Sequence, residues 1–172
     1  MSLKPNSIVF TSNTGYTREY AVLLGERTGL PVYSLEEAGK RLAPGNTIVY
    51  LGWLMAGKVQ GYAKASSRYH IAAVCGVGMG ANGSQLGDVR KANGLAEELP
   101  LFTLQGGFDI TRLRGVYKLM MTVMAKTLGK KLAEKTDRTP DEDDMLALLT
   151  RGGSRVCVDN LTEVVDWYRK AE

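Results

Sequence analysis

Histidine and cysteine are scarce in this sequence. The 172 residues include one histidine, His70, and two cysteines, Cys75 and Cys157, which lie far apart in the chain. Most Ser/His, Cys/His and His-metal sites are excluded, because each needs histidine as a base or a ligand. Two cysteines are too few for a disulfide framework or a zinc site, so we expect reduced thiols in the core and no metal. Catalysis by this chain would therefore depend on a cofactor.

Long apolar runs are also missing. No stretch approaches the roughly 18 uninterrupted apolar residues that indicate a membrane-spanning helix, and residues 1–6 lack the pattern of a signal peptide. We therefore expect a cytoplasmic protein. Glycine shows no period and proline is rare, which excludes a collagen-like chain. An apolar content of 44% over this length predicts one globular domain, residues 1–172, with a single core.

Positive charge is concentrated in one segment. The formal net charge is +4, yet residues 112–135 alone hold seven lysine or arginine side chains against one acid, Glu134. The rest of the chain is therefore mildly acidic. Such asymmetry is typical of a binding surface for nucleic acid, anionic lipid or an acidic partner.

Short apolar runs alternate with helical patterns up to residue 105. Buried strands that alternate with helices form a parallel sheet covered on both faces, so the fold class is predicted to be α/β. Ligands of such sheets bind beyond the carboxyl ends of the strands. The expected strands are residues 7–10, 31–35, 47–51, 71–75 and 101–104, and the expected helices are residues 17–28, 36–42, 58–68 and a segment from about 84 to 98.

The alternation stops after the fifth strand. A basic helix with a methionine-rich apolar stripe is expected over residues 113–132, followed by a short helix that ends near Leu149. An amphipathic helix over residues 161–170, capped by Asp159 or Asn160, closes the chain. We interpret residues 106–158 as a helical insertion. Its apolar stripe fits either a helix that covers the protein's own core or a helix at a membrane interface.

The most informative stretch follows the first expected strand. Hydroxyl groups and backbone amides meet here at the start of a helix, an arrangement that suits a phosphate monoester. The stretch contains no lysine, so it is not a Walker A loop. The alternative is an ordinary polar turn in which a threonine, Thr14 or Thr17, caps the helix. The stretch consists of Thr11, Ser12, Asn13, Thr14, Gly15, Tyr16 and Thr17.

The pattern Ser12-x-Thr14-Gly15-x-Thr17 directly after a first strand resembles the phosphate loop of flavodoxins, which holds the 5′-phosphate of FMN. The resemblance covers residues 1–105 and the closing helix. It implies FMN as cofactor and a flavodoxin-like three-layer sandwich with a five-stranded parallel sheet in the order 2-1-3-4-5.

The same resemblance implies that two later loops flank the isoalloxazine ring. Trp53 would stack on the ring. Alternatively, Trp53 occupies a core or rim position without contact to a flavin. Flavodoxins often have a tyrosine in the second of these loops, and its absence here would leave one face of the ring open to a second substrate. The two loops are Gly52, Trp53, Leu54, Met55, Ala56 and Gly57, and Gly76, Val77, Gly78, Met79 and Gly80, the second loop running on to Gly83.

Two other nucleotide or phosphate folds are disfavoured. Residues 78–83 match the letters of the G-x-G-x-x-G dinucleotide fingerprint, but that fingerprint belongs to the first strand turn of its unit. A receiver domain has the same sheet order and needs an aspartate after the third strand, where this chain has Gly52.

The basic insertion is similar to that of the menaquinone-dependent protoporphyrinogen oxidases, flavodoxin-like FMN enzymes that work at a membrane surface. It follows Phe108 and Asp109 and is rich in arginine and methionine. This similarity implies an FMN-dependent oxidoreductase that oxidises a porphyrinogen-like substrate with a quinone acceptor. It also implies contact between residues 112–135 and an anionic membrane on its inner face. No catalytic side chain can be assigned.

Two alternatives remain at this stage. One is a soluble electron-transfer flavodoxin, which would need carboxylates around the flavin; the loops offer only Asp88 and Asp109. The other is a flavin-free basic interaction module, although nucleic acid is not the favoured partner.

Overall fold

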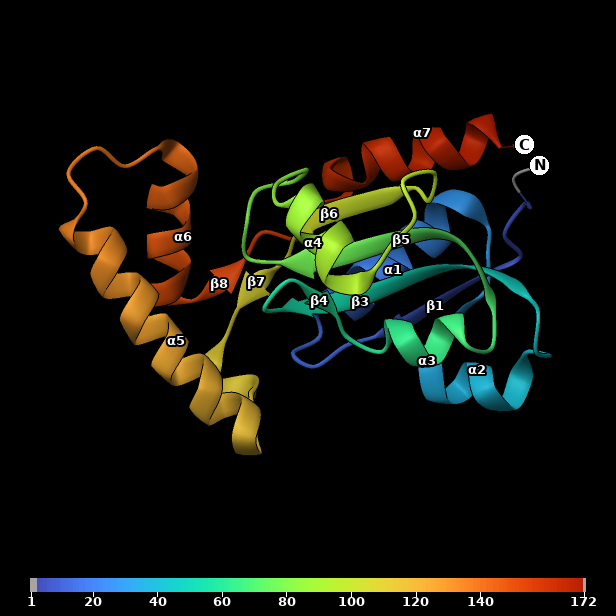
Figure 1. The fold of residues 1–172 in the computed structure, drawn as a ribbon, viewed down its shortest axis with the longest axis horizontal. Coiled ribbons are helices and arrows are strands. Elements are labelled where there is room, and N and C mark those ends of the chain that lie inside the picture. The colour runs from blue at the N-terminus through green and yellow to red at the C-terminus, as the bar shows by residue number, and fades with distance from the viewer. Residues whose placement is uncertain (1–2, 172) are drawn as a thin grey trace.

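A parallel sheet forms the centre of the computed structural model, which describes residues 3–171, and helices cover both faces of the sheet (Figure 1). The strand order is β2-β1-β3-β5-β6, and each neighbouring pair on this path is parallel. This order confirms the predicted flavodoxin-like α/β sandwich. The strands are β1 (Ser7–Thr11), β2 (Val32–Ser34), β3 (Thr47–Met55), β5 (His70–Gly78) and β6 (Leu101–Gln105).

Each face of the sheet has its own apolar core, so the prediction of a single core is wrong. Because successive residues of a strand point to opposite faces, Ile8 packs with Leu24 of α1 in one core and Val9 packs with Ala38 of α2 in the other. Both faces are dry, which explains why the strands are continuous apolar runs. The covering helices are α1 (Tyr16–Thr28) and α7 (Thr162–Lys170) on the first face, and α2 (Leu35–Arg41), α3 (Tyr62–Ser66) and α4 (Leu86–Asn93) on the second.

The third and fourth predicted strands are longer than the sequence indicated. β3 continues to Met55 and pairs antiparallel with β4 (Lys58–Val59), so the expected loop over residues 52–57 is wrong except for its last two residues. Asn93 fixes this hairpin: its side chain accepts from the Val59 amide at 2.9 Å and donates to the Gly57 carbonyl at 2.9 Å. The helix expected from residue 58 is correspondingly reduced to α3.

The strand predicted to end at Cys75 also continues. It runs to Gly78 because its last residues pair with β6, where Gly78 lies opposite Gln105. The expected loop therefore begins after Gly78 rather than at Gly76. The following helix, α4, ends at Asn93 with Gly94 as its C-cap and does not reach Glu98.

The predicted helical insertion is confirmed. Two short strands, β7 and β8, pair antiparallel and connect it to the sheet (Figure 1). Beyond them, α5 and α6 form a helical hairpin at one end of the molecule, and both chain termini lie at the other end. The elements are β7 (Gly107–Phe108), η1 (Ile110–Arg112), α5 (Gly115–Glu134), α6 (Pro140–Arg151), β8 (Gly153–Ser154) and η2 (Val158–Leu161). Within residues 3–171, no helix is both long enough and apolar enough to cross a bilayer.

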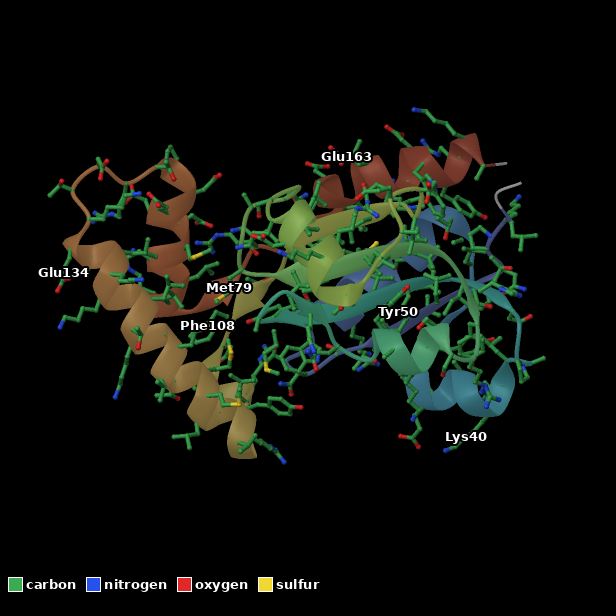
Figure 2. The ribbon with its side chains drawn as sticks, in the orientation of Figure 1. Lys40, Tyr50, Met79, Phe108, Glu134 and Glu163 are labelled. Carbon is green, nitrogen blue, oxygen red and sulfur yellow. The ribbon has the colours of Figure 1, made fainter. Side chains whose placement is uncertain are left out.

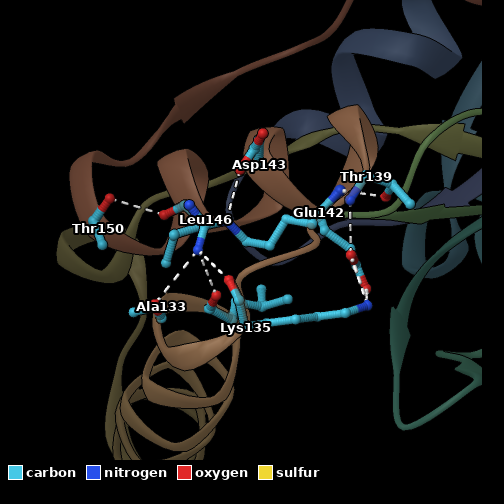
Figure 3. A network of polar contacts seen from close by, with 9 residues as sticks. Ala133, Lys135, Thr139, Glu142, Asp143, Leu146 and Thr150 are labelled. Atoms are coloured by element: carbon cyan, nitrogen blue, oxygen red, sulfur yellow. Dashed lines mark hydrogen bonds and ion pairs between the residues drawn. The ribbon is translucent and has the colours of Figure 1, made fainter.

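Polar contacts close the turn between α5 and α6 (Figure 3). Thr139 and Glu142 form a capping box at the start of α6, and Lys135 reaches the Glu142 carboxylate at 2.7 Å. This lysine holds the pKa of Glu142 below its usual value. Arg138 donates to the Leu132 carbonyl at 2.9 Å and pairs with Asp143 at 2.7 Å, so it joins the two helices.

Two local predictions are wrong. α7 begins after Leu161 without a side-chain cap from the described residues, and neither Asp159 nor Asn160 caps it. The Asn160 amide instead donates to the Tyr20 hydroxyl at 2.7 Å. Of the two thiols expected in the core, only Cys75 is buried, and burial raises its pKa to about 12. Cys157 is exposed because it lies on the loop that leads back from the insertion.

Candidate functional site

A cavity of about 370 Å³ lies between the carboxyl ends of β1, β3 and β5 and the helical insertion. Figure 2 shows Met79 and Phe108 in this region, between the sheet and α5. The position agrees with the general rule that ligands of parallel sheets bind beyond the strand ends. The lining consists of Asn13, Thr14, Tyr16, Thr17, Trp53, Leu54, Met55, Ala56, Gly57, Val77, Gly78, Met79, Gly80, Gln85, Gly107, Phe108, Asp109, Leu113, Met121, Met124, Leu128 and Met145.

All three loops that the sequence singled out contribute to this lining, although they come from separate parts of the chain. The predicted residues that do not line the cavity are Thr11, Ser12, Gly15, Gly52 and Gly76.

Those residues support the cavity from behind. The Thr11 hydroxyl is 2.7 Å from the Tyr50 hydroxyl, and the Ser12 hydroxyl accepts from the Gly15 amide at 3.1 Å. Gly52 and Gly76 are buried within the sheet, where they pair with each other across β3 and β5. These residues shape the loops, and their neighbours in the chain line the cavity.

The start of α1 presents unused hydrogen-bonding groups to the cavity. Gly15 is the N-cap residue and supplies no side chain, so the alternative in which Thr14 or Thr17 caps α1 is wrong. Among residues 3–171, the side chains of Asn13, Thr14 and Thr17 find no hydrogen-bond partner, although Thr17 is only 1% exposed. This end of the cavity therefore offers donors beside a helix N-terminus, where an anion is stabilised.

Arg112 is a site residue that the sequence analysis missed. Its Nη1 donates to the Thr14 carbonyl at 3.1 Å, and its guanidinium lies 5.6 Å from the centre of the Tyr16 ring. The sequence placed Arg112 only in the basic segment, because the contact joins residues that are distant along the chain. The insertion thus brings a cation to a loop that has none of its own.

Asp109 balances this charge. Its carboxylate pairs with Arg112 at 3.1 Å and accepts from the Thr111 hydroxyl at 2.6 Å and the Thr111 amide at 3.0 Å. The hydrogen bonds from Thr111 hold the pKa of Asp109 below its usual value. Among the described residues that line the cavity, Asp109 is the single carboxylate, and it stays ionised at neutral pH.

Methionines form much of the opposite wall. Within residues 3–171, every methionine except Met120 lines the cavity. The sequence predicted two of them, Met55 and Met79, but not the three that α5 and α6 supply. Thioether side chains are flexible and polarisable, so they adapt to irregular or flat apolar ligands. The added methionines are Met121, Met124 and Met145.

A polar network ties the insertion to the loop after β5. The Gln105 side chain donates to the Met79 carbonyl at 3.2 Å and to Asp144 of α6 at 2.7 Å. Arg155 pairs with the same carboxylate at 2.8 Å and lowers the pKa of Asp144. The wall that α5 and α6 form is therefore fixed to the sheet rather than loosely appended.

Comparisons with protein-family models, curated proteins and solved structures gave no match. The two ends of the cavity differ: one has free hydroxyls beside a helix N-terminus, and the other is apolar. This combination fits FMN, which carries a phosphate monoester and a flat ring. No group of histidine, cysteine or acidic residues in the described part of the chain could hold a metal ion.

Trp53 gives the cavity a spectroscopic probe. It lies at the cavity, with its ring 5.4 Å from that of Tyr117 in an edge-on arrangement. If FMN binds as expected, it should quench Trp53 fluorescence, and Trp53→Ala should weaken FMN binding by ~1–3 kcal/mol, with base stacking as a guide. The second tryptophan, Trp167, packs against Phe102 and can be changed to Phe to isolate the Trp53 signal.

If Trp53 lies against the ring, Trp53→Ala should therefore remove the fluorescence that FMN quenches and also weaken FMN binding. Trp167→Phe serves as the matched variant, with unchanged affinity for FMN. Equal FMN affinity in Trp53→Ala and wild type would remove Trp53 from the ring site.

Proposed function

We propose that this chain binds FMN in the cavity and acts as an FMN-dependent oxidoreductase. The observation that supports this most is the pairing of unpartnered hydroxyls, those of Thr14 and Thr17, with an apolar slot in the same cavity. The Thr17 side chain is buried and the Thr14 side chain is half-buried, and neither hydroxyl is used within residues 3–171, so both are available to a ligand. Flavodoxin-like topology, which the sheet has, adds weight to the choice of FMN over other phosphate esters.

Each part of the cavity has a role in this proposal. Thr14, Thr17 and the first amides of α1 would hold the phosphate, and Arg112 would fix the loop through the Thr14 carbonyl. Trp53 and the backbone after β5 would orient the ring. The bound FMN would supply the redox chemistry, while the protein supplies orientation and electrostatics.

The methionine wall favours an apolar second substrate. Met121 and Met124 on α5 and Met145 on α6 form an apolar wall on one side of the slot. We infer a porphyrinogen-like reductant with a quinone acceptor, since both are large and offer extensive apolar surface to such a wall. A pure electron carrier is less well supported: it requires carboxylates around the ring, and Asp109 is already neutralised by Arg112.

Anaerobic turnover tests this proposal. Protein loaded with FMN is mixed with a porphyrinogen and a soluble naphthoquinone, and porphyrin fluorescence is followed. We expect porphyrin to form faster than with the same concentration of free FMN. A rate equal to that of free FMN would contradict the proposed oxidoreductase activity and would favour the electron-carrier alternative.

A further inference from the structure

The first turn of α5, residues 115–118, is weakly stabilised by its own sequence. Its N-cap residue, Arg114, makes no capping hydrogen bond through its side chain within residues 3–171, and no acid lies in the first turn. Gly115 has a φ of +59°, outside the range of a right-handed helix. A helix start without a cap or an acid lacks the contributions that ordinarily hold a first turn together. Contacts with other parts of the chain therefore decide whether this turn stays folded.

Contacts with both ends of the cavity hold the start of α5. Arg112 precedes the helix and donates to the Thr14 carbonyl at 3.1 Å, in the loop before α1. Tyr117 lies in the first turn, with its ring centre 5.4 Å from that of Trp53. Thr14 and Trp53 both line the cavity. A ligand that fills the cavity therefore meets the residues that hold the start of α5.

The peptide bond between Thr14 and Gly15 is held on both sides. Its carbonyl accepts from Arg112, and its amide donates to the Ser12 hydroxyl at 3.1 Å. Arg112 does not line the cavity, so its hydrogen bond directs the Thr14 carbonyl away from the cavity. A carbonyl oxygen that turned into the cavity would repel an anion there, because both carry negative charge. Arg112 therefore keeps the loop in a conformation that suits an anion.

The start of α5 leads directly into the methionine wall. Leu113 is 5% exposed and lines the cavity, and Met121 and Met124 follow on the same helix. The other helix of the insertion has a separate attachment, from Asp144 of α6 to the Gln105 side chain at 2.7 Å. α6 is thus held to the sheet without the loop before α1, whereas the first turn of α5 depends on that loop.

We propose that Arg112 couples binding of the FMN phosphate to folding of the first turn of α5. The coupling rests on the proposed function, because it needs the phosphate in the loop before α1. In one state the turn is folded and Arg112 holds Thr14, as in the structure; in the other the turn is locally unfolded and Arg112 has left. Phosphate binds the first state better, because only there is the Thr14 carbonyl held away from it.

This coupling acts in both directions. A phosphate that prefers the folded turn also stabilises it, by the same factor by which the folded turn favours the phosphate. The wall that follows Leu113 is therefore complete only when the phosphate is bound. A second substrate then meets a finished cavity after FMN, and not before it.

Hydrogen–deuterium exchange of the full chain tests this proposal, with FMN or riboflavin at concentrations that saturate the protein by visible absorption. Riboflavin has the same ring and no phosphate, so the difference between the two flavins isolates the phosphate. In wild type, FMN should slow amide exchange over residues 109–118 about 10-fold more than riboflavin does. In Arg112→Met, which keeps an unbranched side chain and removes its donors, the two flavins should protect these residues equally.

Arg27→Met is the matched control, because Arg27 is an exposed arginine in the last turn of α1. This variant should keep the wild-type difference between FMN and riboflavin. Equal protection by the two flavins in wild type would overturn the coupling and leave FMN binding intact. A difference that persists in Arg112→Met would overturn it as well.

Affinity and the flavin-free protein give two further measurements. Arg112→Met should reduce the preference for FMN over riboflavin about 10-fold, the same factor as the exchange difference. Without flavin, residues 109–118 should exchange faster in Arg112→Met than in wild type. An unchanged preference or equal flavin-free rates would overturn the coupling alone. A wild type that binds neither flavin would contradict the proposed function, and the coupling with it.

Discussion

Replacing Thr14 and Thr17 together by alanine should weaken FMN binding by about 100-fold or more. The two hydroxyls line the cavity beside the N-terminus of α1 and have no other partner among residues 3–171. A hydrogen bond to a charged group contributes ~1.5–3 kcal/mol, so the loss of two exceeds a 100-fold change in affinity. Fluorescence titration of FMN against wild type and the double variant measures the change.

Riboflavin separates a phosphate site from a general loss of binding, because it has the same ring without the phosphate. Its affinity should differ little between wild type and the double variant. Thr28→Ala/Thr150→Ala removes two hydroxyls that bond to helix carbonyls outside the cavity, and it should bind both flavins like wild type. Equal losses for FMN and riboflavin would show that the loop does not hold the phosphate.

Gly61→Ala should destabilise the fold by about 3 kcal/mol. Gly61 has a φ of +79°, which costs an alanine ~1–2 kcal/mol. Its added Cβ would overlap the hydroxyls of Tyr50 and Thr11, which are 2.7 Å apart. Tyr50 also donates to the Gln60 carbonyl at 2.7 Å, so the buried ring cannot move aside without breaking a hydrogen bond, and such overpacking costs ~1–3 kcal/mol. Urea unfolding measures the difference.

Gly39→Ala is the matched control for this variant. Gly39 lies inside α2, has an ordinary helical φ, and would meet no atom within 4 Å through its new Cβ. Alanine there should stabilise the protein by up to ~1 kcal/mol. A Gly61→Ala variant as stable as wild type would show that the Thr11, Tyr50 and Gln60 contacts tolerate displacement.

Local patterns were sufficient to predict the sheet and the position of the polar loop before α1. Each strand is an apolar run bounded by polar turns, and Ser12, Thr14 and Thr17 lie directly after the first of them. Strand ends were predicted less well. Gly52 and Gly76 suggested loops, yet both residues lie within strands because neighbouring strands supply their hydrogen bonds.

Contacts between distant parts of the chain were not predictable from local patterns. The approach of Arg112 to Thr14 depends on how β7 leads the chain back across the sheet edge. Similarly, the stripe of α5 predicted an apolar face but not its division between the cavity and the exterior, because periodicity does not tell what packs against a helix. Cys157 was misplaced for the same reason: its exposure is set by the return loop, not by its neighbours in sequence.

Equilibrium titration of the flavin-free protein with FMN, followed by visible absorption, tests the central claim most directly. We expect perturbed flavin bands that saturate at one FMN per chain, with riboflavin bound at least ~100-fold more weakly for want of the phosphate contacts. An FMN spectrum that stays identical to that of the free cofactor at saturating protein would contradict FMN binding in the cavity.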